Sequence, residues 1–144
     1  MIVKLVADNP NFFSAMVILA GSVDPAEEKP ERWRPWLFKT PLNWFVPGAM
    51  RPSNEELWYL KKDLVHLKED FKKISCRVYI LHGDKDELVP VGNVEYAKKM
   101  LTNAASISIT IFPGENHFIP WTRFQEIKEV LLQLQEPTGV ITTR

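Results

Sequence analysis

The chain has 144 residues, which suits a single domain over residues 1–144 with a moderate hydrophobic core. Hydrophobic residues make up 45% and charged residues 25%, proportions typical of a globular protein and not of a disordered one. The 18 basic and 18 acidic side chains cancel, so no net positive field attracts nucleic acid and we expect no nucleic-acid partner.

The first predicted element is a helix at the amino terminus. Residues 1–9 (MIVKLVADN) place Ile2, Leu5 and Val6 on one face and begin without a capping residue, as the latter part of a helix would. The same stretch carries charges where a secretory signal is uniformly apolar. The longest apolar run that follows, residues 12–20, is too short to span a bilayer. We therefore expect a cytoplasmic protein with no membrane contact.

Three short apolar runs predict β-strands that are buried on both faces. They are residues 15–21 (AMVILAG), 77–82 (RVYILH) and 107–112 (ISITIF). Each is rich in β-branched or aromatic residues, and each ends in glycine or is followed directly by glycine or a Pro-Gly turn. These features are typical of parallel strands covered by helices.

Helical patterns separate and follow these strands. Ser53 and Glu56 form a capping box ahead of leucines spaced three and four residues apart. Pro90 suits the first turn of a second helix, and a third helix begins near residue 122. The expected inner face of this third helix consists of Phe124, Ile127, Leu131 and Leu134. The alternation of strands and helices predicts an α/β fold with a three-stranded parallel sheet flanked by helices.

Residues 24–52 interrupt this order. They hold six of the 11 prolines and three of the five tryptophans (Trp33, Trp36 and Trp44), so they cannot form one regular element. We interpret residues 24–72 as a cap-like insertion whose aromatic side chains cover something apolar. Two interpretations of the proline-rich part remain open: a lid that faces a ligand, and a surface connection that packs on the domain.

The single cysteine, Cys76, can form neither an internal disulfide nor a metal site by itself. We expect it to pack at the start of the second strand, in a reducing compartment. The three histidines do not combine with Cys76 or the acids at metal-ligand spacing, so no metal site is expected. Of these histidines, we expect His66 to be exposed and His82 to end its strand with a structural hydrogen bond.

Polar side chains gather after the second and third strands. Gly83 allows a sharp turn off the second strand, and three carboxylates follow it: Asp84, Asp86 and Glu87. His117 follows the third strand, and the carboxyl ends of neighbouring parallel strands lie at one edge of a sheet. A carboxylate there can hold one imidazole nitrogen and leave the other free as a base. The structural alternatives are a turn carboxylate and a histidine that caps the last helix, and we expect Asp84 and Glu87 to be solvated.

These loops resemble the carboxy-terminal part of an α/β-hydrolase. GDKD at residues 83–86 with LVP at residues 88–90 is similar to the family's acid loop, and GENHF at residues 114–118 is similar to its histidine loop. The resemblance implies that Asp86 is the catalytic acid and His117 the catalytic base of a serine esterase or lipase-like enzyme. It implies no cofactor and a small acyl substrate, for which we expect contacts from Trp121, Leu88 and Trp36.

The resemblance also identifies what this stretch of sequence does not contain. Residues 15–25 (AMVILAGSVDP) resemble the strand after the nucleophile's helix, and residues 1–9 resemble the end of that helix. No G-x-S-x-G nucleophile elbow occurs in the 144 residues. We therefore expect negligible acyl transfer by the isolated chain, which lacks both the nucleophile and the oxyanion hole.

Two other functions remain open. The first strand, residues 15–21, would have a neighbour on both sides in a complete fold of this family, so its free edge favours a homo-oligomer or a complementing amino-terminal segment. The chain could then serve as a non-catalytic binding or assembly module. Alternatively, the missing elbow could hold an aspartate nucleophile, as in dehalogenases and epoxide hydrolases.

Overall fold

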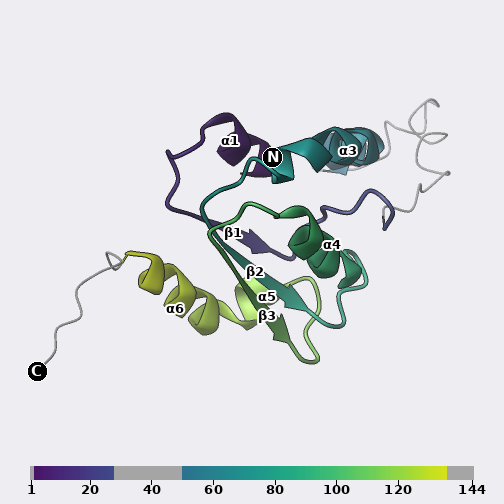
Figure 1. Ribbon diagram of the computed structural model, residues 1–144. Helices are drawn as coiled ribbons and strands as arrows, with labels where there is room; N and C mark the ends of the chain where they lie inside the picture. The colour runs from purple at the N-terminus through teal and green to yellow at the C-terminus, as the bar shows by residue number, and fades with distance from the viewer. Residues whose placement is uncertain (1, 28–49, 136–144) are drawn as a thin grey trace, which may run out of the picture.

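The sheet and its helices follow the predicted alternation. The computed structural model describes residues 2–27 and 50–135. Three parallel strands form one sheet in the order β1-β2-β3, and helices lie on both of its faces (Figure 1). The elements are, in chain order, α1 (Ile2–Asp8), β1 (Ala15–Leu19), α3 (Met50–Phe71), β2 (Arg77–Gly83), α4 (Gly92–Met100), β3 (Ser106–Phe112), α5 (Ile119–Thr122) and α6 (Phe124–Gln135). The predicted α/β class is confirmed.

Side chains of β1 and β2 alternate between two hydrophobic clusters, one on each face of the sheet. Met16 and Ile18 of β1 pack with Val78 and Ile80 of β2 in a cluster covered by α1, α3 and α4. The intervening residues face the other cluster, where α5 and α6 contribute Ile119 and Ile127. This two-residue period is what strands impose, and it separates the helices into two layers.

The expectation that every strand is buried on both faces is wrong for β3. Only Phe112 of this strand is buried, and Ile109 and Ile111 are exposed. In the part of the chain that the structure describes, β3 has a strand on one side only. The helices pack over β1 and β2, so the side chains in the middle of β3 receive little cover.

Several element boundaries differ from those predicted. Ser53 lies inside α3, so it does not cap that helix. Pro90 precedes α4, whose N-cap residue is Val91, so the proline is not in the first helical turn. The first strand ends at Leu19 because Ala20 adopts a left-handed backbone conformation, with φ of 44°. Local propensity locates such ends to within a few residues only.

The outer helices expose apolar side chains that periodicity assigned to the core. On α6, Ile127 is buried but Phe124 and Leu131 are exposed. On α1, Val3 and Val6 are buried while Leu5 is exposed, as is Ile2. A three-stranded sheet offers only a narrow surface, so each helix can bury one thin stripe against it.

The cap-like interpretation of residues 24–72 stays a prediction. Trp33, Trp36 and Trp44 lie outside the described residues. Within the same interval, the last turns of α3 pack against α1, and Phe71 belongs to the hydrophobic cluster on the sheet; Leu64 is also buried.

Candidate active site

The acid loop, residues 84–91, holds the carboxylate of Asp86 in a fixed and buried position. The Asp86 side chain has 0% exposure. Its Oδ1 accepts hydrogen bonds from the backbone N–H groups of Leu88 at 3.0 Å and Val89 at 2.8 Å. This Asx-type turn uses one carboxylate oxygen to close the loop and leaves Oδ2 for another partner.

That partner is His117, which lies in the loop after β3. Its Nδ1 is 2.8 Å from Oδ2 of Asp86, across a sequence separation of 31 residues. Gly83 and Phe112 are register partners at the ends of β2 and β3, so the parallel pairing delivers both loops to the same edge of the sheet. The predicted convergence of Asp86 and His117 is present in the structure.

The contact determines which imidazole nitrogen is available. An ionised carboxylate can only accept, so Nδ1 of His117 carries the proton. Nε2 of the neutral ring then has a free lone pair, and no hydrogen bond from a described residue reaches it. The His117 side chain is 33% exposed, so the imidazole is partly accessible. An imidazole held in this way can accept a proton from a nearby hydroxyl.

Gly83 allows the two loops to approach closely, which is a different role from the one predicted. A Cβ at Gly83 would clash with the carbonyl oxygen of Glu115 and would lie 2.7 Å from that of Asn116. Its backbone remains in the strand, so no sharp turn requires the glycine. Only a residue without a side chain lets the histidine loop lie directly against the end of β2.

His82 and Asp84 also support the loops. The prediction of a structural hydrogen bond is confirmed for His82, whose Nε2 donates to the carbonyl of Val89 at 2.9 Å. The same nitrogen is 3.6 Å from Oδ2 of Asp86, a proximity that the sequence did not predict. Asp84 is exposed as expected, but its Oδ1 accepts a hydrogen bond from the backbone N–H of Gly114 at 2.6 Å.

Asn93 is a further organising residue that the sequence analysis missed. It is 1% exposed, and its Oδ1 accepts hydrogen bonds from the backbone N–H groups of Val23 and Asp24, both at 2.8 Å. Its Nδ2 donates to the carbonyl of Pro90 at 2.9 Å. The side chain therefore ties the segment after β1 to the end of the acid loop. The one sequence feature that could have indicated this role is a polar residue on the apolar face of the predicted helix that contains Val94 and Ala97.

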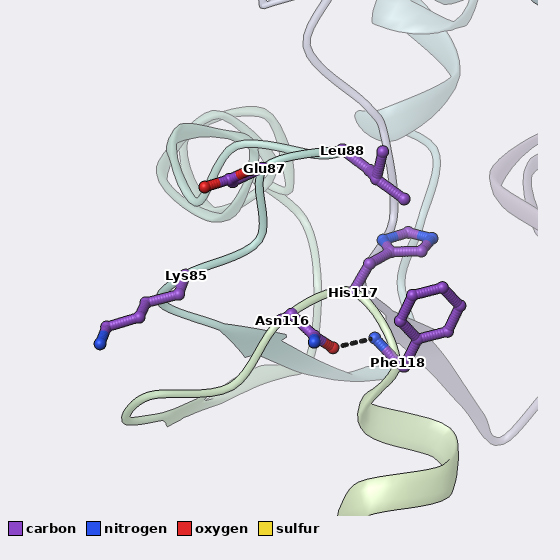
Figure 2. A pocket seen from close by; sticks show the side chains of 6 residues that line it. All are labelled: Lys85, Glu87, Leu88, Asn116, His117 and Phe118. Atoms are coloured by element: carbon purple, nitrogen blue, oxygen red, sulfur yellow. Dashed lines mark hydrogen bonds between the residues drawn. The ribbon is translucent and has the colours of Figure 1, made fainter.

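An open pocket of about 400 Å³ lies beside His117. It is lined by Lys85, Glu87, Leu88, Asn116, His117 and Phe118. Leu88 and Phe118 lie on either side of the imidazole, whereas Lys85 points away from it (Figure 2). Apolar side chains therefore lie next to the imidazole in this pocket.

Of the three residues predicted to contact the substrate, one lines this pocket. Leu88 lines it directly. Trp121 is 76% exposed and does not line it, but its ring packs edge-on against Phe118 with centroids 5.9 Å apart. Phe118 was not predicted, although it directly follows the histidine. Trp36 lies outside the described residues.

Cys76 does not belong to this site. It packs partly against the core directly before β2, as expected. The site follows the other end of that strand, which is about 20 Å away for seven residues of β-structure. Burial raises the pKa of the Cys76 thiol, which keeps it protonated and unreactive.

Neither a metal cluster nor a membrane span is found in the described ranges 2–27 and 50–135. No group of three or more potential ligand side chains gathers there. None of the described helices combines the length and the apolar character needed to cross a bilayer.

The parallel sheet with helices on both faces is part of an α/β-hydrolase fold, as comparison with solved structures shows. A monoacylglycerol lipase from Paleococcus ferrophilus superposes with a TM-score of 0.64 at 12% identity, covering 92% of this chain and 64% of the lipase. A peroxisomal α/β-hydrolase from Saccharomyces cerevisiae gives 0.63 at 13% identity, covering 99% of this chain and 53% of that protein. The chain thus corresponds to a fragment of that fold.

Sequence comparison identifies the family. The chain belongs to the prolyl oligopeptidase family, whose sequence model matches residues 1–135. A putative non-heme chloroperoxidase from Synechocystis sp. is 28% identical over 69 residues, which are 48% of this chain and 24% of that protein. The chain spans less than two-thirds of the length of these relatives.

Proposed function

We propose that this chain supplies the acid and the base of a Ser-His-Asp triad in an α/β-hydrolase that hydrolyses an ester or related acyl substrate. The observation that supports this most directly is the hydrogen bond between buried Asp86 and His117 at the carboxyl edge of the sheet. The nucleophile and the oxyanion hole come from a segment that precedes these residues in the complete enzyme. The chemistry needs no metal or cofactor.

In the proposed reaction, Nε2 of His117 accepts the hydroxyl proton of the serine as its oxygen attacks the substrate carbonyl. Asp86 stabilises the resulting imidazolium and keeps the ring oriented. The same nitrogen then returns the proton to the leaving group, which departs and leaves an acyl-enzyme. A water molecule, deprotonated by His117, hydrolyses that intermediate.

The apolar side of the pocket favours an acyl substrate with an apolar group near the scissile bond. Leu88 and Phe118 line the pocket on either side of His117 (Figure 2). The family description points to peptide bonds and the lipase relative to glycerol esters. Both are acyl substrates, so the proposal covers them, and we place esters first because of the apolar pocket walls.

A labelling experiment tests the nucleophile and the base together. We suggest extending residues 1–144 with the in-frame coding sequence upstream and treating the product with a fluorophosphonate probe. A triad serine reacts covalently, and His117→Ala should abolish labelling. An extended protein that hydrolyses substrate without being labelled would instead indicate an aspartate nucleophile. Labelling that persists in His117→Ala would contradict the assigned base.

A second proposal concerns assembly. In the described part of the chain, β1 has a neighbouring strand on one side only, and exposed apolar side chains, among them Leu5 and Phe12, lie on α1 and on the loop that leads into β1. We propose that a second copy or the preceding amino-terminal segment covers this edge. Sedimentation should show association of residues 1–144 that disappears when the preceding segment is attached. A monodisperse monomer of residues 1–144 at high concentration would contradict it.

A further inference from the structure

We infer that Asp84 is a positioning residue that holds the histidine loop, residues 113–118, against the acid loop so that Nδ1 of His117 meets Asp86. Its catalytic consequence rests on the proposed function, but its structural effect can be measured without catalysis. Asp84 does not contact the pocket's reacting side, so it would act only through His117.

The link from Asp84 to the histidine loop is short and joins distant parts of the chain. Oδ1 of Asp84 accepts a hydrogen bond from Gly114 N–H at 2.6 Å, across 30 residues. The backbone hydrogen bonds around the same turn are longer: Asp84 N–H to Phe112 O is 3.2 Å, and Glu115 N–H to Phe112 O is 3.4 Å. A hydrogen bond to an ionised acceptor is stronger than one between neutral groups, so the Asp84 contact is the strongest of these three hydrogen bonds.

The loop packs against Gly83 at Glu115 and Asn116, but no described residue packs against the open side of Gly114. Gly114 has φ of 78°, and no atom of the described residues lies within 4 Å of the position where its Cβ would be. The turn is therefore open to solvent on that side and has few contacts that could replace the carboxylate. Beyond it, Lys85 N–H donates to Glu115 O at 2.9 Å and Arg123 Nε donates to Glu115 Oε1 at 2.9 Å.

The position of the turn is transmitted to the acid and the base over very short segments. Gly114 is three residues before His117, and Asp84 is two residues before Asp86. The imidazole is partly exposed, and its only described hydrogen bond is the one to Asp86. A displacement of about 1 Å between the loops would lengthen that 2.8 Å contact beyond hydrogen-bonding range.

The alternative is that Asp84 is an ordinary solvated turn carboxylate whose loss changes nothing at the site. The two cases differ in the tautomer of His117. If Asp84 positions the loop, the proton stays on Nδ1 only while Asp84 or an equivalent acceptor is present. If it does not, the tautomer is independent of residue 84.

The test is long-range ¹H–¹⁵N NMR of the imidazole rings in the full 144-residue chain at about pH 8, where histidine is neutral. The variants are Asp84→Ala, Asp84→Asn and the control Asp63→Ala, which removes an exposed carboxylate of α3 that makes no hydrogen bond or ion pair with another described residue. A His117→Gln spectrum assigns the signal. We expect Asp84→Ala to lower the Nδ1–H fraction of His117 at least about twofold, because the ring then samples both tautomers. Asp84→Asn should restore it, since the amide oxygen still accepts from Gly114.

Each other outcome contradicts the inference. An unchanged tautomer in Asp84→Ala would show that Asp84 does not position His117, while leaving the proposed function intact. Loss of far-UV circular dichroism in that variant would also contradict it, because the inferred effect is confined to two loops. A wild-type spectrum without the Nδ1–H form would contradict the Asp86–His117 contact itself, and with it the proposed function.

Discussion

Oδ2 of Asp86 lies 2.8 Å from Nδ1 of His117, although neither residue belongs to a regular element and 31 positions separate them. Three features produce this contact: the parallel register of β2 and β3, the Asx-type turn that fixes Asp86, and the absence of a side chain at Gly83.

His117→Ala, made in the protein extended by its upstream coding sequence, should remove nearly all hydrolysis of a chromogenic ester. Loss of a triad base typically costs about 10⁴- to 10⁶-fold in kcat. The side chain is partly exposed, so the thermal unfolding midpoint should change little. His66→Ala is the matched control, because His66 is exposed on α3. Wild-type rates in His117→Ala would rule out the assigned base.

Gly83→Ala should destabilise the fold by about 1–3 kcal/mol, as expected when a methyl group is forced against rigid neighbours. The clash is with the backbone carbonyls of Glu115 and Asn116, which cannot move without shifting the histidine loop. Gly92→Ala is a suitable control, because a Cβ there would approach only the flexible end of the Glu27 side chain. Urea unfolding of the two variants measures the difference. Equal stability of both would contradict the close-approach role of Gly83.

Asn93→Ala should cost about 2–4 kcal/mol of unfolding free energy, since three hydrogen bonds are lost and the Val23 N–H is left buried without its acceptor. Asn103→Ala serves as the control, because that side chain is exposed and makes one hydrogen bond to a carbonyl. Chemical denaturation compares them. A cost for Asn93→Ala no larger than that of the control would mean that Asn93 does not hold the two segments together.

Asp70 should make stability depend on acid pH. Its hydrogen bond with Lys73 at 2.6 Å, assisted by Lys4, holds the pKa of the Asp70 carboxyl below its usual value. A depressed folded-state pKa stabilises the protein above the unfolded pKa, near 4, and this stabilisation is lost as the pH falls through the folded value. Asp70→Asn should therefore be less stable than wild type at pH 7, and the difference should shrink below about pH 4. A difference that stays constant from pH 7 to strongly acidic conditions would contradict this; Asp63→Asn is the control.

Trp121→Ala should raise KM for esters with a bulky apolar group and leave kcat nearly unchanged. The reason is that Trp121 packs against Phe118, which lines the pocket, and is not itself a lining residue. A short acetyl ester provides the comparison within the same variant, because it is too small to reach this wall. Equal effects on both esters would show that Trp121 has no part in binding.

The class of fold and the acid–base candidates were predictable from short patterns. Three β-rich runs alternate with helical periods, and each of the last two runs precedes a glycine-containing polar loop. Helix and strand ends were less predictable, as Ser53 and Pro90 show. Capping residues and prolines indicate where an element can start, but packing selects among the possible starts.

Side-chain burial and the supporting contacts depended on the tertiary structure. The exposure of Ile109 and Phe124 follows from how little of the sheet the helices cover, which no local pattern encodes. No local pattern predicts that Nε2 of His82 lies 3.6 Å from Oδ2 of Asp86. None predicts the three hydrogen bonds of Asn93 either. Sequence periodicity indicates which face of an element is apolar, but it does not identify the residues that pack against that face in the folded chain.

The sequence, together with its resemblance to α/β-hydrolases, was enough to name Asp86 and His117 as the candidate acid and base, because loops that follow neighbouring parallel strands lie at one edge of the sheet. Only the tertiary structure decided how they are held. The oxygen of Asp86 that faces His117, the need for glycine at position 83 and the link from Asp84 to Gly114 are all contacts between loops about thirty residues apart. Such contacts depend on the packing of the folded chain, which short-range sequence patterns do not specify.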